Sequence, residues 1–204
     1  NENTCVGNYA GFKITSGASN TIIGYDCGFN LTTGSNNIII GNDAGVTGSP
    51  GGNATTDANS IRLADENIGA AHIQVDWTVA SDQRDKTDFT ALDVGLDFVN
   101  ALKPYTYKWD KRSKYGNKKA DDYDLNAQTP DGTHKEDWLD IGFKAQEVET
   151  LEKTIGYKIA DKTNLTTSLT EDGKQYGIKY SKFIPILVKA VQELSATVTT
   201  LQQE

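Results

Sequence analysis

A repeat of 17 residues occupies the N-terminal part of the chain and constrains its fold more than any other feature. Each repeat has an asparagine followed directly by a short run rich in β-branched residues, such as Thr21-Ile22-Ile23 or Ile38-Ile39-Ile40. Glycines then follow each run at fixed positions. The residues that recur at this interval are Asn3, Asn20 and Asn37; Gly7, Gly24 and Gly41; Gly11, Gly28 and Gly45; and the pair Gly17 and Gly34.

Each repeat predicts one short strand and one tight turn, with glycine where the backbone takes a positive φ or approaches a neighbour closely. One unit cannot bury its own apolar face, so the units must stack. Glycine at this density disfavours helix, because each costs about 1 kcal/mol inside one. We therefore predict an all-β repetitive segment, a β-roll or β-helix, over residues 1–80 with its repeats at 3–48. A loop at 48–59 and further strands at 61–63 and 73–79 complete it.

The two cysteines fall on repeat positions. Cys5 aligns with Ile22 and Ile39, and Cys27 aligns with two alanines, Ala10 and Ala44. This pattern favours small, buried apolar side chains over a disulfide or a reactive thiol. Turn and strand-cap roles are likewise favoured for the repeat asparagines, and carbohydrate binding is the alternative. With two distant histidines to add, no zinc spacing is found, and no phosphate-binding glycine loop occurs, so we expect no metal and no cofactor.

Charge is distributed unevenly along the chain. The 204 residues carry 28 acidic and 20 basic side chains, a net charge of −8, which argues against general binding to nucleic acid or to anionic membranes. No apolar run is long enough to span a bilayer. Residues 1–80 contain only two bases, Lys13 and Arg62, so two kinds of folding unit are expected to meet near Ser81. The repeat pattern is already under way at Asn3, and we expect the chain to be part of a longer protein.

The junction contains a hydroxyl five residues before a lysine, in the sequence Ala80-Ser81-Asp82-Gln83-Arg84-Asp85-Lys86. Ser81 Oγ can reach the carbonyl carbon of Ala80 through a five-membered ring, and the resulting ester can be hydrolysed by water. Serine needs a base to take its proton, and Lys86 is the candidate.

An amine acts as a base only when it is neutral, which burial or a nearby cation such as Arg84 favours and a facing carboxylate such as Asp82 opposes. The chemistry therefore requires a dry, assembled pocket. The plainer alternative is a solvated polar turn before a helix.

Residues 81–204 predict an α+β domain. Apolar spacing predicts a helix from Phe89 to Leu102, and alternating aromatics predict a strand at Tyr105, Tyr107 and Trp109. Residues 110–137 predict a solvated loop. A strand at Leu139–Phe143 then meets a helix that begins near Gln146 and Glu147. These two residues either line the pocket around Ser81 or cap the helix, and the pattern does not decide between the two.

The last element is a long helix whose apolar residues follow the 4-3 spacing of a coiled coil. The alternative is an amphipathic helix packed on its own domain, and the spacing does not decide between the two. The residues of this spacing, called the seam below, are Tyr180, Ile184, Leu187, Val191, Leu194, Val198 and Leu201.

From Ser81 onwards, the order of elements resembles the C-terminal intramolecular chaperone domain of endosialidase-type phage tailspikes and tail fibres. The resemblance spans residues 81–204 and departs from the family at Asp85, where an apolar residue is common. It implies a homotrimer with a coiled coil at 180–204, a serine nucleophile at Ser81 and a lysine base at Lys86. It also implies cleavage before Ser81 once three chains have assembled. Residues 3–48 resemble head and shaft repeats of trimeric phage tail fibres and bacterial adhesins.

These observations predict the C-terminal part of a phage tail fibre or spike. Residues 81–204 would drive trimerisation and folding of the repeats, then leave after cutting the Ala80–Ser81 bond, which makes the chain a self-cleaving serine endopeptidase. The expected partners are further copies of the chain and a host-cell surface receptor such as a glycan. The expected location is the virion tail, after assembly in the bacterial cytoplasm. The main alternative is a receptor-binding tip whose trimerisation domain stays attached and never cuts. A glycan-degrading site in the repeats has little support, because their few carboxylates show no pairing.

Overall fold

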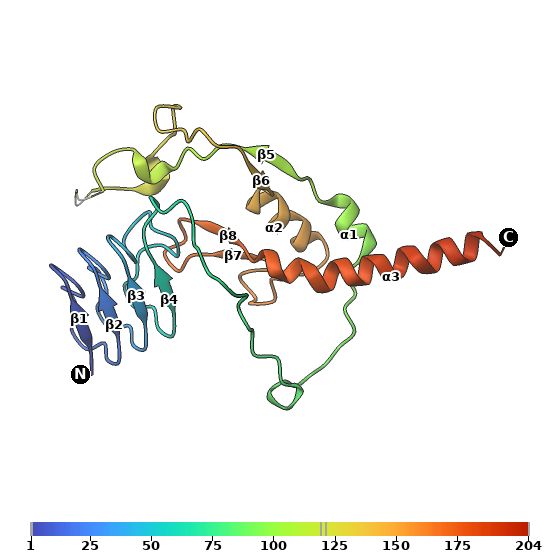
Figure 1. The fold of residues 1–204 in the computed structure, drawn as a ribbon, viewed down its shortest axis with the longest axis horizontal. Helices are drawn as coiled ribbons and strands as arrows, with labels where there is room; N and C mark the ends of the chain where they lie inside the picture. Colours follow the sequence, from blue (N-terminus) through green and yellow to red (C-terminus); the bar gives the residue numbers. More distant parts are fainter. Residues whose placement is uncertain (1, 119, 121, 204) are drawn as a thin grey trace. The chain divides into compact units, whose positions relative to one another are not determined.

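The computed structural model describes residues 2–118, 120 and 122–203, which form a mixed α/β fold of two compact units (Figure 1). The first unit combines residues 1–69, 106–142 and 169–177, and the second combines residues 70–105, 143–168 and 178–204. The strands are β1 (Thr4–Val6), β2 (Thr21–Ile23), β3 (Ile38–Ile40), β4 (Ile61–Leu63), β5 (Tyr105–Tyr107), β6 (Asp140–Gly142), β7 (Thr167–Leu169) and β8 (Tyr176–Ile178). The helices are α1 (Leu96–Ala101), α2 (Ala145–Thr154) and α3 (Phe183–Leu201), and 3₁₀ turns occur at Gln83–Asp85, Arg112–Lys114, Leu125–Ala127 and Tyr180–Lys182.

The repeats stack as coils, each of which adds one strand to a parallel sheet in the order β1-β2-β3-β4 (Figure 1). Cys5 pairs with Ile22, and Ile22 pairs with Ile39, so the 17-residue alignment of the sequence is confirmed as the register of the sheet. The last step pairs Ile39 with Arg62, an offset of 62 − 39 = 23 residues. The coil that leads from β3 to β4, called the fourth coil below, is therefore six residues longer than the two before it. The loop predicted at 48–59 accounts for the difference.

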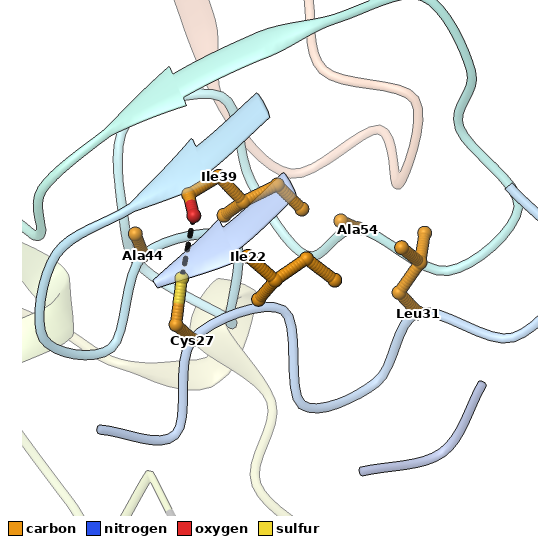
Figure 2. Packing of buried hydrophobic residues seen from close by; sticks show 6 residues of the cluster. All are labelled: Ile22, Cys27, Leu31, Ile39, Ala44 and Ala54. Atoms are coloured by element: carbon orange, nitrogen blue, oxygen red, sulfur yellow. Dashed lines mark hydrogen bonds between the residues drawn. The ribbon is translucent and has the colours of Figure 1, made fainter. Parts of the chain in front are cut away.

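The coils enclose a narrow core, to which the coil that begins with β2 and the coil that begins with β3 each contribute three apolar side chains. Figure 2 shows it: Ile22, Cys27, Leu31, Ile39, Ala44 and Ala54. The thiol of Cys27 is buried and donates to the carbonyl oxygen of Ile39 at 3.0 Å, and burial raises the pKa of this thiol to about 11. The prediction of a small buried side chain is thus confirmed for Cys27. It is wrong for Cys5, which is exposed because β1 is the edge strand of the sheet.

The repeat asparagines form a hydrogen-bonded ladder across the coils. Asn20 Nδ2 donates to Asn3 Oδ1 at 3.0 Å, and Asn37 Nδ2 donates to Asn20 Oδ1 at the same distance. Each Nδ2 also reaches a backbone carbonyl, of Gly34 from Asn20 and of Asp57 from Asn37. Since Asn20 and Asn37 are each 1 % exposed, the ladder uses amides that water cannot reach, and the predicted turn and strand-cap role is confirmed for them.

Gly24 supports the first stability prediction, because its backbone takes φ +140° and a Cβ there would stand 2.3 Å from the carbonyl oxygen of Gly41. We expect Gly24→Ala to destabilise the coils by roughly 2 kcal/mol or more, from backbone strain and from forcing two coils apart. Gly69→Ala is the control, since nothing lies within 4 Å of its Cβ position. Thermal unfolding followed by circular dichroism measures the difference, and equal midpoints for both variants would contradict the close stacking of the coils.

The second unit packs its helices around an apolar core, in which α1 lies against α3. The core comprises Val94, Phe98, Val148, Phe183 and Ile186. Helix α1 is shorter than the helix predicted from Phe89 to Leu102, because it begins only at Leu96. The backbone N–H of Leu96 has no partner within the helix, and a side chain of α3 accepts its hydrogen bond. Glu193 Oε2 accepts from the backbone N–H of Leu96 at 2.7 Å, and this bond fixes where α1 begins.

A buried carboxylate joins α2 to β7 and supports the second stability prediction. Glu152 is fully buried and accepts from the backbone N–H groups and the hydroxyls of Thr166 and Thr167 at 2.6–3.2 Å. Burial by itself raises the pKa of Glu152, but these hydrogen bonds outweigh it and hold the pKa below its usual range. A group with a depressed folded-state pKa stabilises the fold above its unfolded-state pKa of about 4.3, and that stabilisation is lost as the pH falls through the folded-state value.

We expect Glu152→Gln to lose about 1–3 kcal/mol of unfolding free energy at pH 7, since the amide NH₂ then faces donors. The loss should shrink as the pH falls below about 4.3, where the unfolded wild-type chain binds a proton at this carboxylate while the folded chain, whose pKa is depressed, does not yet do so. Urea unfolding at pH 7 and at pH 3.5 measures both effects, and a difference independent of pH would contradict an ionised Glu152.

The strand predicted at 73–79 is wrong. Residues 64–95, all described, contain no strand, and every residue from 67 to 91 is exposed. The alternating side chains of this segment are 52–79 % exposed: Ile73, Val75, Trp77 and Val79. A strand needs a neighbour to pair with its backbone and to cover its apolar face, and the single chain provides neither here.

Candidate functional site: the turn at Ala80–Lys86

A single 3₁₀ turn (Gln83–Asp85) brings Ser81 and Lys86 together. The N–H groups of Asp85 and Lys86 donate to the carbonyls of Asp82 and Gln83, each at 3.2 Å, which folds the chain back over five residues. Lys86 Nζ then lies 2.6 Å from Ser81 Oγ. The nucleophile and the candidate base are therefore within direct proton-transfer distance.

The charged neighbours of this pair bond to each other. Asp82 Oδ1 accepts from the backbone N–H of Arg84 at 2.9 Å and caps the turn, while Arg84 Nη2 lies 2.6 Å from Asp82 Oδ2. The hydrogen bond from Arg84 lowers the pKa of Asp82, and Asp82 raises the pKa of Arg84. The two charges largely offset each other, so the role of this pair is to hold the turn in shape rather than to place a net charge beside Lys86.

The pair lies in water in the single chain, because both residues belong to the exposed stretch 67–91. Water competes for the serine proton and solvates the ammonium, and both effects oppose catalysis. The geometry of a Ser–Lys pair is present, while the dry pocket that the chemistry needs is not formed by one chain.

Gln146 and Glu147 lie in the first turn of α2, and their hydrogen bonds go elsewhere. Tyr105 Oη donates to Glu147 Oε2 at 2.9 Å, and Lys144 Nζ lies 3.2 Å from Glu147 Oε1. The bond from Tyr105, followed by that from Lys144, holds the pKa of Glu147 below its usual range. Within the described residues, neither side chain bonds to Ser81 or Lys86, and no side chain caps the N-terminus of α2. Glu147 instead ties α2 to β5.

The seam remains open to solvent in the single chain. All seven seam residues are 45–65 % exposed. The side of α3 that packs in the second unit is a different one, formed by Phe183, Ile186 and Ala190, which are 2–6 % exposed. Helix α3 therefore packs on its own domain, as the alternative predicted, but it does so through this other side and leaves the seam exposed in the single chain.

Sequence reasoning missed several charged residues that the fold buries. Arg62 occupies the inward position that Ile39 holds one coil earlier, and it forms an ion pair of 2.6 Å with the buried Asp57. Glu66 is also buried, against lysines from the segment predicted as a solvated loop. A lone arginine in a repeat position is a usable signal for such a pair, whereas the partner of Glu66 is too distant in sequence to be found by pattern.

No group of three or more histidine, cysteine, aspartate or glutamate side chains that could bind a metal occurs in residues 2–118, 120 and 122–203. No helix in this part of the chain is both long enough and apolar enough to cross a membrane.

Comparison with known proteins gives one match. The model of a family described as "Chaperone of endosialidase" matches residues 81–156. The match begins at Ser81, the first residue of the Ser–Lys pair. Neither a curated protein nor a solved structure matched the chain. Residues 81–156 therefore belong to the chaperone-of-endosialidase family.

Proposed function

We propose that residues 81–204 are the intramolecular chaperone of a phage tail fibre or spike, which trimerises the chain, aids folding of residues 1–80, and is then released by cutting the Ala80–Ser81 bond. The observation that carries this proposal is the 2.6 Å contact between Lys86 Nζ and Ser81 Oγ at the first residue of the family match. The trimeric fibre would sit in the virion tail after assembly in the host cytoplasm. Its repeats would contact a host-cell surface receptor, for example a glycan.

The exposed seam supports assembly from several copies of the chain. Fully burying one leucine, isoleucine or valine side chain is worth about 1.5–3 kcal/mol. Seven seam residues per chain, at 45–65 % exposure, leave much of this stabilisation unused in the single chain. A coiled coil of three α3 helices would bury the seam, and it would also place three copies of residues 1–80 side by side in the same orientation.

The repeats explain why such a chain needs a folding aid. Successive 17-residue repeats present similar apolar core positions and the same ladder of asparagines, so a slip by one repeat keeps many of the contacts. Parallel strands that pair across a trimer are also slow to form, since their contacts are distant in sequence or lie between chains. Fixing three chains at their C-terminal ends removes the slipped arrangements and the encounter step.

The proposed reaction uses only groups of the chain and one water molecule. Lys86 takes the proton of Ser81 Oγ as the oxygen attacks the carbonyl carbon of Ala80. The bond from this carbon to the nitrogen of Ser81 breaks, and that nitrogen receives the proton. Water then hydrolyses the ester, which leaves a carboxylate on Ala80 and a free amine on Ser81. Because both reactants are in one chain, correct orientation is worth up to roughly 7–11 kcal/mol.

Assembly would switch this reaction on. The turn is exposed in one chain, and so is the apolar segment 73–79 directly before it. In a trimer, this segment can pair with other copies and exclude water from the turn, which would favour the neutral amine of Lys86.

The intact mass of the purified wild-type chain under denaturing conditions tests the proposal. We expect two fragments, of residues 1–80 and 81–204, in equal amounts. A single uncut chain in an assembled trimer would instead support the alternative, a receptor-binding tip whose trimerisation domain stays attached.

A further inference from the structure

Two segments that follow Ser81 in sequence fold together with the repeats that precede it. Residues 106–142 and 169–177 belong to the same compact unit as residues 1–69, although the proposed cut separates them covalently. Their contacts concentrate on residues 48–67, which form the longer fourth coil with β4 (Figure 1).

In the first set of contacts, three lysines of residues 111–118 bind Glu66 and Asn67. Glu66 is 7 % exposed, and its carboxylate forms an ion pair with Lys118. Lys111 Nζ donates to the backbone carbonyl of Glu66 at 2.8 Å, and Lys114 Nζ donates to the side chain of Asn67. Without Lys118, the carboxylate of Glu66 would be buried and unpaired, which is strongly unfavourable.

The second set comes from the loop between β7 and β8. The backbone N–H of Asn53 donates to Asp172 Oδ2 at 3.1 Å, and Thr56 Oγ1 donates to Glu171 Oε1 at 3.3 Å. Gly52 permits this approach, because a Cβ there would stand 3.0–3.1 Å from atoms of Thr170 and Asp172.

The two sets are joined to each other and packed tightly. Arg112 Nη2 donates to the carbonyl of Lys174 at 2.6 Å, which links the lysine segment to the β7–β8 loop. Ser113 is buried against Gly48, where a Cβ would stand 2.5 Å from the Cβ of Ser113. The interface therefore combines an ion pair and hydrogen bonds with close backbone packing, whereas every residue of the connecting stretch 68–91 is exposed.

We infer that residues 111–118 and 170–175 form a non-covalent clasp on residues 48–67, which keeps the C-terminal product bound to the repeats after the Ala80–Ser81 bond is cut. This inference rests on the proposed function, because the clasp has a role only if the chain is cut before Ser81. Cutting and release are then separate steps. The partner recognised by residues 81–204 after the cut is the fourth coil, and recognition depends in part on the Lys118–Glu66 ion pair, which salt weakens.

The clasp can be tested without relying on self-cleavage. Residues 70–76, which are exposed, are replaced by a seven-residue recognition sequence for a site-specific protease in a Ser81→Ala chain. After complete cutting, size-exclusion chromatography in 150 mM salt should show both fragments eluting together. Raising the salt to 1 M should increase the fraction of separated fragments several-fold, and immediate separation at 150 mM would overturn the clasp.

Lys118→Ala in the same background tests the ion pair on Glu66. We expect the fragments of this variant to separate at least ten times faster than those of the parent chain. Lys158→Ala is the matched control, because its pair with Asp161 is exposed and 3.8 Å long, and it should behave as the parent does. Equal retention in both variants would overturn the role of Lys118. If the wild-type chain never cuts itself but the protease-cut chain stays together, the proposed function fails and the clasp stands.

Discussion

Chains that carry Lys86→Ala should assemble normally and remain uncut. The amine lies 2.6 Å from Ser81 Oγ and is the group placed to take its proton. Loss of a general base typically slows a reaction by about 10²–10⁴-fold, so cleavage that is complete in wild type should be nearly undetectable over the same period. Ser81→Ala removes the nucleophile and should abolish the cut. Denaturing gel electrophoresis over a time course after purification measures both effects.

Gln83→Ala is the matched control for this experiment. Gln83 lies in the same exposed turn, and only its backbone carbonyl takes part in the turn's hydrogen bonds. This variant should cut at the wild-type rate. Lys86→Ala chains that cut as fast as wild type would show that another group is the base, although the position of the cut could still be right.

Leu187→Asp should prevent assembly and, through it, cleavage. Leu187 is 46 % exposed in the middle of the seam, on the side of α3 next to the face that packs in the second unit. In a trimer, the substitution would bury three carboxylates close together, each at a cost of several kcal/mol. The fold of the single chain should be retained, because Phe183, Ile186 and Ala190 keep their contacts.

Light scattering after size exclusion should find the Leu187→Asp chain monomeric and uncut, with an unchanged helical signal by circular dichroism. Ala196→Asp introduces the same charge on the same helix at an exposed position outside the seam, and it should trimerise and cut. A monomeric Leu187→Asp chain that still cuts itself would separate cleavage from assembly.

The stacking of the coils could be predicted from sequence because their contacts repeat the chain's own period. Residues 17 apart meet in space, so aligning Cys5 with Ile22 and Ile39 gave the register directly. The Ser81–Lys86 contact was predictable for a similar reason, since one local turn suffices to join residues five apart. The seam could be recognised from the 4-3 spacing of its apolar residues, but only the structure could show that α3 packs in its own domain through a different face.

Features that depend on distant residues could not be predicted in this way. Helix α1 begins at Leu96 because Glu193, 97 residues away, accepts from its backbone N–H. The apolar alternation at 73–79 indicated a strand, yet a strand forms only where another chain or segment pairs with it. The mixed charges of residues 110–137 predicted a solvated loop. Nothing in that pattern indicates that the buried carboxylate of Glu66 lies beside Lys118.

Native mass spectrometry of the refolding wild-type chain tests the central claim most directly, since it reports the number of copies and the covalent state of each molecule together. We predict that the fragment beginning at Ser81 is found only in species that contain three copies, and that its amount grows as the uncut trimer declines. Cut monomers early in refolding, or trimers that stay intact, would contradict a cut made by Ser81 and Lys86 within the assembled protein.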